Sequence, residues 1–335
     1  MEAIKPNVDG DWLVVVNPNA GKRKGERNWG KIARSLEDAN ISFVSVFTQR
    51  KFQAIQLTKK HIEKKYCKII VVGGDGTLNE VINGIFLQNK YPVEKIIVGM
   101  IPVGTGNDWC RMYNIPADYN EATKLIAEQN TFVQDVGLVH YYEDNMLRKR
   151  YFVNMVGMGY DALVTKKTNK QKEAGKSNPL SYYFNLVTSL FHYSPITTKI
   201  DVDGKKIKVR AFSISTGINH YNGGGMKQLP EAIPNDGIMD MTVIRNLGKI
   251  MVIRSINKLY DGSFVKMPQV STHKGKRITI SSKGKRKLML EADGESLGHS
   301  PFSINIIPRA VTFIVPKVVN GKYAEYAQKQ KISAV

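Results

Sequence analysis

The sequence predicts an α/β N-terminal domain built on a parallel sheet, followed by an antiparallel β-sandwich domain. In the first 130 residues, β-branched apolar runs alternate with segments of helical periodicity, which is typical of parallel strands joined by crossover helices. Beyond that point, short strands separated by tight turns predominate. A chain of 335 residues is long enough for two such domains.

The N-terminal α/β domain is assigned to residues 1–130. Its expected strands are continuous apolar runs, as in strands buried on both faces, at Trp12–Val16, Ile41–Phe47, Ile69–Val72 and Lys95–Ile101. Helical spacing is expected from Trp29 to Leu36 and from Phe52 to Lys65.

The β-sandwich domain is assigned to residues 131–309. Its expected strands are Val153–Met158, Ile196–Val202, Lys206–Thr216, Ile238–Arg245, Arg277–Ser282, Lys287–Ala292 and Ser303–Ile307. Asp203-Gly204 is a strong hairpin signal, and Ile250–Tyr260 is expected to be a helix. The aromatic-rich stretch Leu180–Phe191 is interpreted either as a core helix or as an apolar wall that admits acyl chains.

A glycine-rich turn follows the strand Ile69–Val72, with the sequence Gly73-Gly74-Asp75-Gly76-Thr77. Glycines allow a sharp turn and a close approach of backbone to ligand. Thr77 and Glu80 have the spacing of a capping box, which predicts that a helix begins at Thr77. A strand, a glycine turn and a helix N-terminus together form an anion site. Asp75 would repel a bound phosphate unless a cation lies between them, so the turn predicts nucleotide phosphate together with a divalent metal.

Two further loops, at Asn17 and Gly104, follow other strands of the same sheet. Ligands of open parallel sheets bind outside the carboxyl ends of the strands, so the three loops are expected to converge on one nucleotide. The alternative is that each loop is only a tight connection. The glycine turn matches neither a P-loop nor the dinucleotide-binding fingerprint.

Five motifs resemble the diacylglycerol kinase-like lipid kinases, a family that includes the sphingosine and ceramide kinases. They are Asn17-Pro18-x-Ala20-Gly21, Gly73-Gly74-Asp75-Gly76-Thr77 with Asn79-Glu80, Pro102-x-Gly104-Thr105-x-Asn107-Asp108, Pro234-Asn235-Asp236-Gly237-Ile238-Met239-Asp240 and Glu291-Ala292-Asp293-Gly294-Glu295. The glycine motif is shared with NAD kinases and phosphofructokinases, whereas the third and fifth motifs favour the lipid branch. The resemblance implies a nucleotide cleft between the two domains. It also implies that a strand near residues 310–330 returns to complete the first domain.

The resemblance also implies roles for individual residues. Asp293 would be the catalytic base with Glu295 beside it, and Asp75 remains a candidate for the same role. A magnesium–water network would include Asp75, Asp108 and Asp135. A structural magnesium would be held by Asp236 and by the carbonyls of Ile233 and Ile238. The residues implied to line ATP are Asn17, Gly21, Thr48, Gly73, Gly74, Asp75, Gly76, Thr77, Asn79, Glu80, Gly104 and Thr105.

The chain is strongly basic, with 49 Lys and Arg against 29 Asp and Glu, a net charge of +20. This balance predicts an anionic partner. The basic residues cluster at Lys166–Lys176, expected to be an exposed mobile loop, and at Lys274–Lys287. No nucleic-acid-binding module is recognisable, so peripheral contact with an anionic membrane is favoured and no nucleic acid is expected. The alternative is a solvated, solubilising surface.

Cellular location follows from three further absences in the sequence. The two cysteines, Cys67 and Cys110, have no metal-ligand spacing, and the first residues have no signal-peptide core. No stretch approaches the roughly 20 apolar residues of a membrane span. A cytoplasmic protein that associates peripherally with membranes is therefore expected; a homodimer is compatible with the sequence, which does not determine the oligomeric state.

The combined interpretation is an ATP- and Mg²⁺-dependent lipid kinase that phosphorylates a lipid hydroxyl, with diacylglycerol as the first candidate and phosphatidic acid as its product. The enzymatic alternative is an NAD or sugar kinase that shares the glycine motif. The alternative from another class is a non-catalytic protein that binds anionic membranes or nucleic acid on the same fold.

Overall fold

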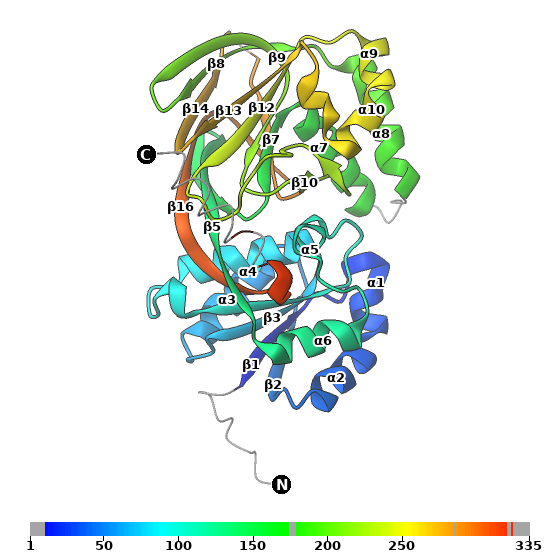
Figure 1. The fold of residues 1–335 in the computed structure, drawn as a ribbon, viewed down its shortest axis with the longest axis vertical. Helices are drawn as coiled ribbons and strands as arrows, with labels where there is room; N and C mark the ends of the chain where they lie inside the picture. The colour runs from blue at the N-terminus through cyan, green and yellow to red at the C-terminus, as the bar shows by residue number, and fades with distance from the viewer. Residues whose placement is uncertain (1–10, 174–178, 285, 320–322, 324–335) are drawn as a thin grey trace. The chain divides into compact units, whose positions relative to one another are not determined.

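The apolar runs near the start of the chain form a sheet of parallel strands (Figure 1). This computed structural model describes residues 11–173, 179–284, 286–319 and 323. The chain divides into two units, Met1–Asp135 with Arg309–Val335, and Val136–Pro308. The division expected after residue 130 therefore falls after Asp135, within a strand.

The first unit is an α/β layer structure. Its strands are β1 (Trp12–Val16), β2 (Phe43–Phe47), β3 (Lys68–Gly73) and β4 (Ile97–Pro102). Its helices are α1 (Ala20–Arg27), α2 (Trp29–Asp38), α3 (Gln53–Ile62), α4 (Asp75–Leu87), the 3₁₀ helix η1 (Val93–Lys95), α5 (Asp108–Tyr113) and α6 (Tyr119–Glu128). The sheet order is β4-β3-β1-β2, with every neighbouring pair parallel.

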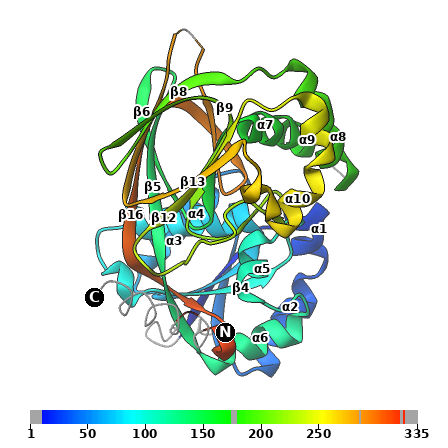
Figure 2. The ribbon, with the colours of Figure 1, turned by 45° about the horizontal axis from the view of Figure 1, so that its top comes forward.

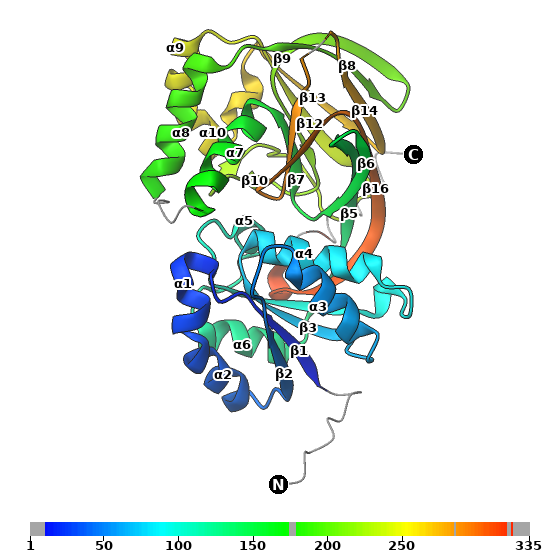
Figure 3. The same cartoon turned by 180° about the vertical axis from the view of Figure 1, so that it is seen from behind.

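Helices cover both faces of this sheet, and α3 and α4 lie together on one face while α2 and α6 lie on the other (Figures 1 and 3). Trp29 at the start of α2 packs edge-to-face on Phe43 and Phe47 of β2, with ring centroids 6.1 and 5.3 Å apart. The long strand β16 (Glu295–Ile314) pairs in parallel with β4 through Thr312 and Phe313. The chain thus returns to the first sheet near its C-terminal end, as the resemblance implies.

The second unit is rich in antiparallel strands, as predicted. Its other strands are β5 (Thr131–Glu143), which begins in the first unit, β6 (Met146–Phe152), β7 (Met155–Gly159), β8 (Ile196–Val202), β9 (Lys205–Gly217), β10 (Tyr221–Asn222), β11 (Met226–Lys227), β12 (Met239–Arg245), β13 (Val270–Gly275), β14 (Arg277–Ser282) and β15 (Met289–Ala292). Asp203 and Gly204 form the predicted hairpin between β8 and β9, both with positive φ.

The strands of the second unit do not form the two separate sheets of a sandwich. Hydrogen-bonded pairing runs from β9 through β7, β15, β16, β14 and β8 and then back to β9, and every pair is antiparallel. β9 is long enough, at 13 residues, to pair with β8 along its first half and with β7 along its second half. The ladder therefore closes into a barrel, and β12 and β13 extend it from β9.

Four α-helices lie along one side of these strands (Figure 2). They are α7 (Tyr160–Glu173), α8 (Pro179–His192), α9 (Lys249–Arg254) and α10 (Ile256–Asp261), followed by the 3₁₀ helix η2 (Ser263–Lys266). The helix expected over Ile250–Tyr260 is thus broken at Ser255. The prediction of a loop at Lys166–Lys176 was wrong for the residues up to Glu173, which belong to α7. This helix forms because it buries Val164 and Thr168, which are four residues apart and lie on one face. Residues 174–178 lie outside the described residues.

Candidate functional site

The three loops predicted to converge do lie together at the carboxyl ends of β1, β3 and β4. The Asn17 Nδ2 donates to the Thr77 Oγ1 at 3.0 Å, which joins the first loop to the glycine turn. The backbone N–H groups of Val103 and Gly104 both donate to the Gly73 carbonyl, at 2.8 and 3.1 Å. The convergence is therefore a property of the folded first unit.

Glycines make this close approach possible. A Cβ on Gly104 would lie 2.6 Å from the Gly74 Cα, closer than real carbon atoms pack. A Cβ on Gly21, which has φ of 60°, would lie 1.8 Å from the Val103 carbonyl oxygen. Backbone meets backbone at both contacts, which leaves a surface formed by main-chain groups.

Helix α4 begins at Asp75, two residues earlier than the capping-box spacing predicts. Gly74 is the N-cap residue in an extended conformation, so no side chain caps the helix there. Thr77 lies buried in the first turn, where its hydroxyl accepts the hydrogen bond from Asn17. The N-terminal N–H groups of α4 are thus placed directly behind the glycine turn.

Glu80 does not cap its own helix, and the capping-box prediction was wrong on this point. Its carboxylate accepts hydrogen bonds from the backbone N–H of Phe52 at 3.0 Å and of Ala54 at 3.1 Å. These groups belong to the N-terminus of α3, where a carboxylate is stabilised by the helix dipole. Glu80 thereby fastens the loop that follows Thr48, whose own N–H donates to the Val16 carbonyl at 2.9 Å.

The other residues implied to line ATP differ in exposure. Gly74, Asp75 and Gly76 are half-buried and Thr105 is exposed. Asn79 has no exposed surface and accepts a hydrogen bond from the Asn83 Nδ2 at 3.2 Å. The buried side chain of Asn79 thus forms a hydrogen bond within its own helix, α4.

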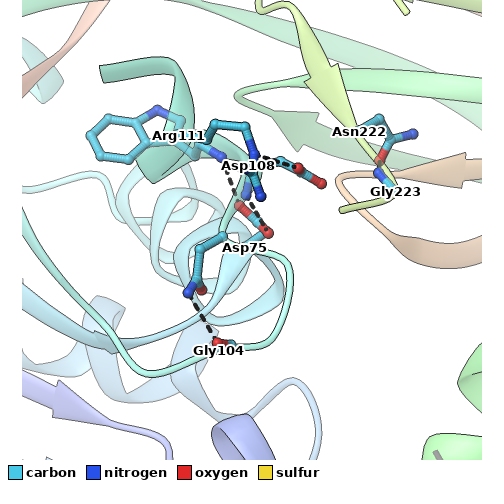
Figure 4. A network of polar contacts seen from close by, with 8 residues as sticks. Asp75, Gly104, Asp108, Arg111, Asn222 and Gly223 are labelled. Atoms are coloured by element: carbon cyan, nitrogen blue, oxygen red, sulfur yellow. Dashed lines mark hydrogen bonds and ion pairs between the residues drawn. The ribbon is translucent and has the colours of Figure 1, made fainter. Parts of the chain in front are cut away.

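Asp75 and Asp108 are brought together (Figure 4). The Asp75 carboxylate accepts the backbone N–H of Asp108 at 3.0 Å and of Trp109 at 2.9 Å, which caps the N-terminus of α5. The Asp108 carboxylate is buried and lies 3.7 Å from the Arg111 Nε. Their charges, after burial as the larger cause, raise the pKa of the Cys110 thiol well above its usual value.

Asp135 lies at the end of the first unit, where its Oδ1 accepts the backbone N–H of Arg309 at 2.6 Å. Its neighbour Gln134 accepts hydrogen bonds from the Trp109 indole at 2.9 Å and from the Tyr113 hydroxyl at 2.7 Å. Trp109 therefore links Gln134, the residue before Asp135, to the Asp75 carboxylate. Within the described residues, no three His, Cys, Asp or Glu side chains converge as metal ligands. The pair Asp75–Asp108 suits a hydrated cation that meets carboxylates through water.

The turn before β12 carries the second set of implied metal ligands. The Asp236 Oδ1 accepts the Ile238 N–H at 3.0 Å. In the described structure, two buried oxygens have no hydrogen-bond partner here, Oδ1 of Asn235 in this turn and Oδ2 of Asp240 at the start of β12. Burial, with repulsion from Asp236 and Glu231, raises the pKa of Asp240 to about 6 although Lys274 opposes the shift. Carboxylate, amide and carbonyl oxygens suit magnesium or calcium, so the residues fit a structural cation here.

Asp293 and Gly294 form the hairpin turn between β15 and β16, with φ of 47° and 81°. The Asp293 Oδ2 accepts the Val153 N–H at 2.8 Å, and its Oδ1 accepts those of Asn154 and Met155 at 2.9 and 3.1 Å. Three backbone donors hold this carboxylate in one orientation. Glu295, the first residue of β16, is half-buried.

Two further carboxylates in the second unit were missed from the sequence, the buried Glu291 and the half-buried Asp161. Glu291 has no exposed surface; it accepts the Asn222 Nδ2 at 2.7 Å and the Gly294 N–H at 2.9 Å. Figure 4 shows Asn222, whose side-chain oxygen accepts the Gly223 N–H at 2.9 Å. The available signal was the motif Glu291-Ala292-Asp293-Gly294-Glu295 itself, in which Glu291 lies on β15 two residues before the Asp293-Gly294 turn.

Asp161 opens α7 beside Gly157, where a Cβ would lie 2.5 Å from the Glu291 Oε1 and 3.2 Å from the Asp161 Cβ. Burial raises the pKa of Asp161, against hydrogen bonds from Ser213, Ser215 and Gln228. Burial also raises the pKa of Glu291 to about 8, with the charges of Asp161 and Asp293 adding to the shift. Protonated Glu291 is therefore the main form in the folded protein at neutral pH.

Glu291→Gln is expected to remove a pH dependence of stability. The free energy of unfolding of the native protein should fall between pH 4.5 and 8, because the folded state keeps a proton that unfolded glutamate releases. The neutral amide cannot release a proton, so the variant should gain on the order of a few kcal/mol relative to the native protein between pH 5 and 8.

Urea unfolding at several pH values measures this difference in the free energy of unfolding. The control is Glu37→Gln, at an exposed residue of α2. A difference between the Glu291→Gln variant and the native protein that does not change with pH would contradict the assignment of a protonated Glu291.

An apolar pocket lies in the second unit beneath the helices α7–α10. Its floor is polar, formed by Asp161, Ser213, Ser215, Gln228 and Thr242. Its walls include Val164, Leu186, Phe212, Met226, Leu247 and Val252. The Ser215 hydroxyl lies 3.1 Å from the Asp161 Oδ2 and 2.7 Å from the Gln228 Oε1. Such a pocket suits an apolar ligand that carries a polar group at one end.

The aromatic-rich segment Leu180–Phe191 is helical and belongs to α8. Leu186 and Leu190 are buried in a core cluster of the second unit, and Leu186 lines the pocket. Phe184 and Phe191 are 64% and 58% exposed. Core packing alone therefore does not account for this helix.

Comparisons with known proteins agree over both units. Residues 11–139 match the diacylglycerol kinase catalytic domain, and residues 154–315 match the YegS C-terminal NAD kinase beta sandwich-like domain. A diacylglycerol kinase of Staphylococcus carnosus is 28% identical over 313 residues, which is 92% of this chain and 96% of that protein. A second, from Staphylococcus haemolyticus, is 29% identical over 321 residues, or 94% and 91%.

The fold is also similar to a solved structure of a diacylglycerol kinase from Bacillus anthracis, with 25% identity and a TM-score of 0.69. That comparison covers 92% of this chain and 98% of the other. The similarity thus extends over nearly the whole length of each partner.

Proposed function

We propose that this chain, which belongs to the diacylglycerol kinase-like lipid kinases, transfers the γ-phosphate of ATP to the free hydroxyl of diacylglycerol. The observation that carries the proposal is the meeting of three glycine-containing loops at Asn17, Gly73 and Gly104, beside the N-terminus of α4. Main-chain N–H groups and a helix dipole favour a polyphosphate at such a surface.

Nucleotide binding is assigned to the first unit. Gly74 and Gly104 would admit the phosphates without side-chain interference, and Thr48 and Thr105 would lie beside the bound nucleotide. Asp75 and Asp108 would hold hydrated magnesium. When bound, magnesium neutralises phosphate charge that would otherwise repel these carboxylates.

Acceptor activation is assigned to the second unit. The lipid hydroxyl oxygen forms the new bond to the γ-phosphorus, the bond to the bridging oxygen of ADP breaks, and the hydroxyl proton passes to Asp293. The three N–H donors orient the Asp293 carboxylate while making it a weak base. A weak base is sufficient, because the transition state of phosphoryl transfer is loose and positioning supplies most of the catalysis.

The lipid acceptor is assigned to the apolar pocket beneath α7–α10. Acyl chains would contact Leu186, Phe212 and Met226. The polar side chains around Asp161 would form hydrogen bonds with the glycerol end of the lipid. An NAD or sugar kinase would gain nothing from a pocket whose walls are apolar, which favours the lipid acceptor over these alternatives.

A phosphorylation assay tests the proposal. Radiolabelled ATP is supplied with diacylglycerol, ceramide and sphingosine in anionic micelles, and with NAD and fructose 6-phosphate in parallel. Labelled phosphatidic acid is the expected product. Label in NAD or in the sugar phosphate, or in no acceptor at all, would contradict the proposal, and the last result would favour a non-catalytic binding protein.

Peripheral contact with an anionic membrane is part of the same proposal. Among the described residues, the second basic cluster is not one patch, because Lys274, Lys276 and Arg277 lie at or just before the start of β14 and Lys283 follows its end. Exposed apolar side chains instead gather on α8 and α9, including Phe191, Ile250 and Met251 at 58%, 68% and 44% exposure. Lys249 joins these helices, with its Nζ 5.2 Å from the Phe191 ring centroid and 3.3 Å from the Phe191 carbonyl oxygen.

Helix α9 and the adjoining α10 also carry exposed Arg254 and Lys258. Apolar side chains that enter a bilayer and basic side chains that contact its headgroups would together bind reversibly. In the described part of the chain, no helix combines the length and apolar character of a bilayer span.

Ile250→Asp is expected to reduce binding to phosphatidylglycerol-containing vesicles about tenfold or more, since a side chain that enters the bilayer is replaced by a charge that the anionic surface repels. Co-sedimentation measures the binding, and ATP affinity should not change. The matched control is Leu147→Asp, at a residue of similar exposure, 60%, on β6. Equal losses for both variants, or none for Ile250→Asp, would contradict this surface; better competition by duplex DNA would favour nucleic acid.

A further inference from the structure

A cation, the ammonium group of Lys274 on β13, already lies beside the segment Pro234–Asp240. Asp240 and Lys274 face each other across the pairing of β12 with β13. The Lys274 Nζ lies 3.0 Å from the Asp240 Oδ1 and 3.4 Å from the Glu231 carbonyl oxygen. The ammonium thus bridges Glu231, which precedes Asp236 in the chain, and Asp240, which follows it.

The oxygens around this ammonium exceed what one lysine can satisfy. The side chain of Asp240 is 9% exposed, and its Oδ2 has no hydrogen-bond partner in the described structure. The Asn235 Oδ1 is also buried and has no hydrogen-bond partner in the described structure. The carboxylates of Asp236 and Glu231 are close enough to repel the charge of Asp240. A buried acceptor without a donor is unfavourable, so these oxygens favour a second cation or water.

We propose that Lys274 is a tethered cation that competes with a divalent metal ion for the Asp240 carboxylate. The inference rests on the proposed metal site at Asp236 and adds that its occupancy is controlled by Lys274. A metal ion drawn to Asp236 and Asn235 meets the positive charge of Lys274 unless the lysine leaves Asp240. Because Lys274 is 43% exposed, its side chain can turn into solvent when the metal takes its place.

Two consequences follow for the native protein. Without metal, the ammonium keeps the acidic turn folded, so the protein does not depend on metal for stability. With metal, part of the binding free energy is spent on displacing the lysine, so the affinity is low. When two cations compete for one partially buried carboxylate at contact distance, each lowers the binding affinity of the other by more than a factor of about ten.

The test measures cation binding to the full-length, nucleotide-free protein after treatment with EDTA. Lys274→Met removes the charge and keeps most of the stem. Calorimetric titration with MgCl₂, and separately with CaCl₂, should show binding at least about tenfold tighter than in the native protein. The thermal unfolding temperature of the metal-free variant should be lower than that of the native protein, and added Mg²⁺ should restore it.

Three further variants make the result specific. Lys276→Met removes an exposed lysine two residues along the same segment, and Lys274→Arg keeps the charge; both should bind cations as the native protein does. Asp236→Asn combined with Lys274→Met should lose the gained affinity. If Lys274→Met does not fold, Lys274→Gln provides the same loss of charge with a donor retained.

Native-like cation affinity in a folded Lys274→Met or Lys274→Gln protein would overturn the proposal, as would an equal gain in Lys276→Met. The readout contains no ATP and no lipid. A protein that fails the phosphorylation assay can therefore still confirm the role of Lys274, and an active kinase can still refute it.

Discussion

Gly74→Val is expected to abolish ATP binding in a protein that still folds. The φ of −125° at Gly74 is accessible to valine, so the backbone itself need not change. The new Cβ would lie 3.0 Å from the Gly104 Cα, and the methyl groups beyond it would push the two loops apart and cover the main-chain surface. We expect a loss of affinity of about 100-fold or more, equivalent to roughly 3 kcal/mol.

Calorimetric titration with ATP measures this loss. Gly30→Val is the matched control, because a Cβ at Gly30 on α2 would meet nothing within 4 Å. Circular dichroism establishes that both variants fold. Native-like ATP affinity in folded Gly74→Val would remove the phosphate site from the glycine turn.

Asp293→Asn is expected to reduce turnover about 10²–10⁴-fold while ATP affinity stays near that of the native protein, because an amide cannot accept the hydroxyl proton. The same change must also affect stability. The amide presents one N–H₂ group to the backbone donors of Val153, Asn154 and Met155, so at least one of these hydrogen bonds is lost. We expect a decrease of about 1–3 kcal/mol in the free energy of unfolding.

Asp203→Asn separates the two effects. Asp203 occupies an equivalent Asp-Gly hairpin between β8 and β9, and its carboxylate accepts the backbone N–H groups of Lys276 and Arg277, both at 2.8 Å. Its loss of stability should be similar, without loss of turnover. If Asp293→Asn keeps activity within a few-fold of the native protein, Asp293 is a structural anchor and the base must be sought at Asp75.

The parallel sheet of the first unit could be predicted from the sequence because its signals are local. Strands buried on both faces must be apolar throughout, and Val14–Val16 and Ile69–Val72 show this without reference to any other part of the chain. The meeting of the three loops follows from the same local signals, since carboxyl ends of parallel strands share one edge. The glycine turn and its neighbours therefore locate the candidate nucleotide site from the amino-acid sequence alone.

Capping and helix boundaries were less predictable because a side chain can serve a distant partner as easily as a near one. Glu80 has the right spacing to cap α4, yet its carboxylate binds the N-terminus of α3, 26 and 28 residues away in sequence. Lys166 and Lys170 belong to a polar stretch that predicts a loop, but the buried residues of the same stretch keep α7 helical. Tertiary burial outweighed composition in this helix.

What the sequence by itself determined is the α/β first unit, the antiparallel character of the second, the hairpin at Asp203-Gly204 and the family motifs. Only the tertiary structure decided that the second ladder closes into a barrel, because closure depends on β9 pairing with both β7 and β8. Only the tertiary structure brought Glu291 and Asp161 together against Gly157, and Lys274 against Asp240. Burial and the proximity of other charges set the proton and cation affinities of these carboxylates, and both arise only when distant strands meet.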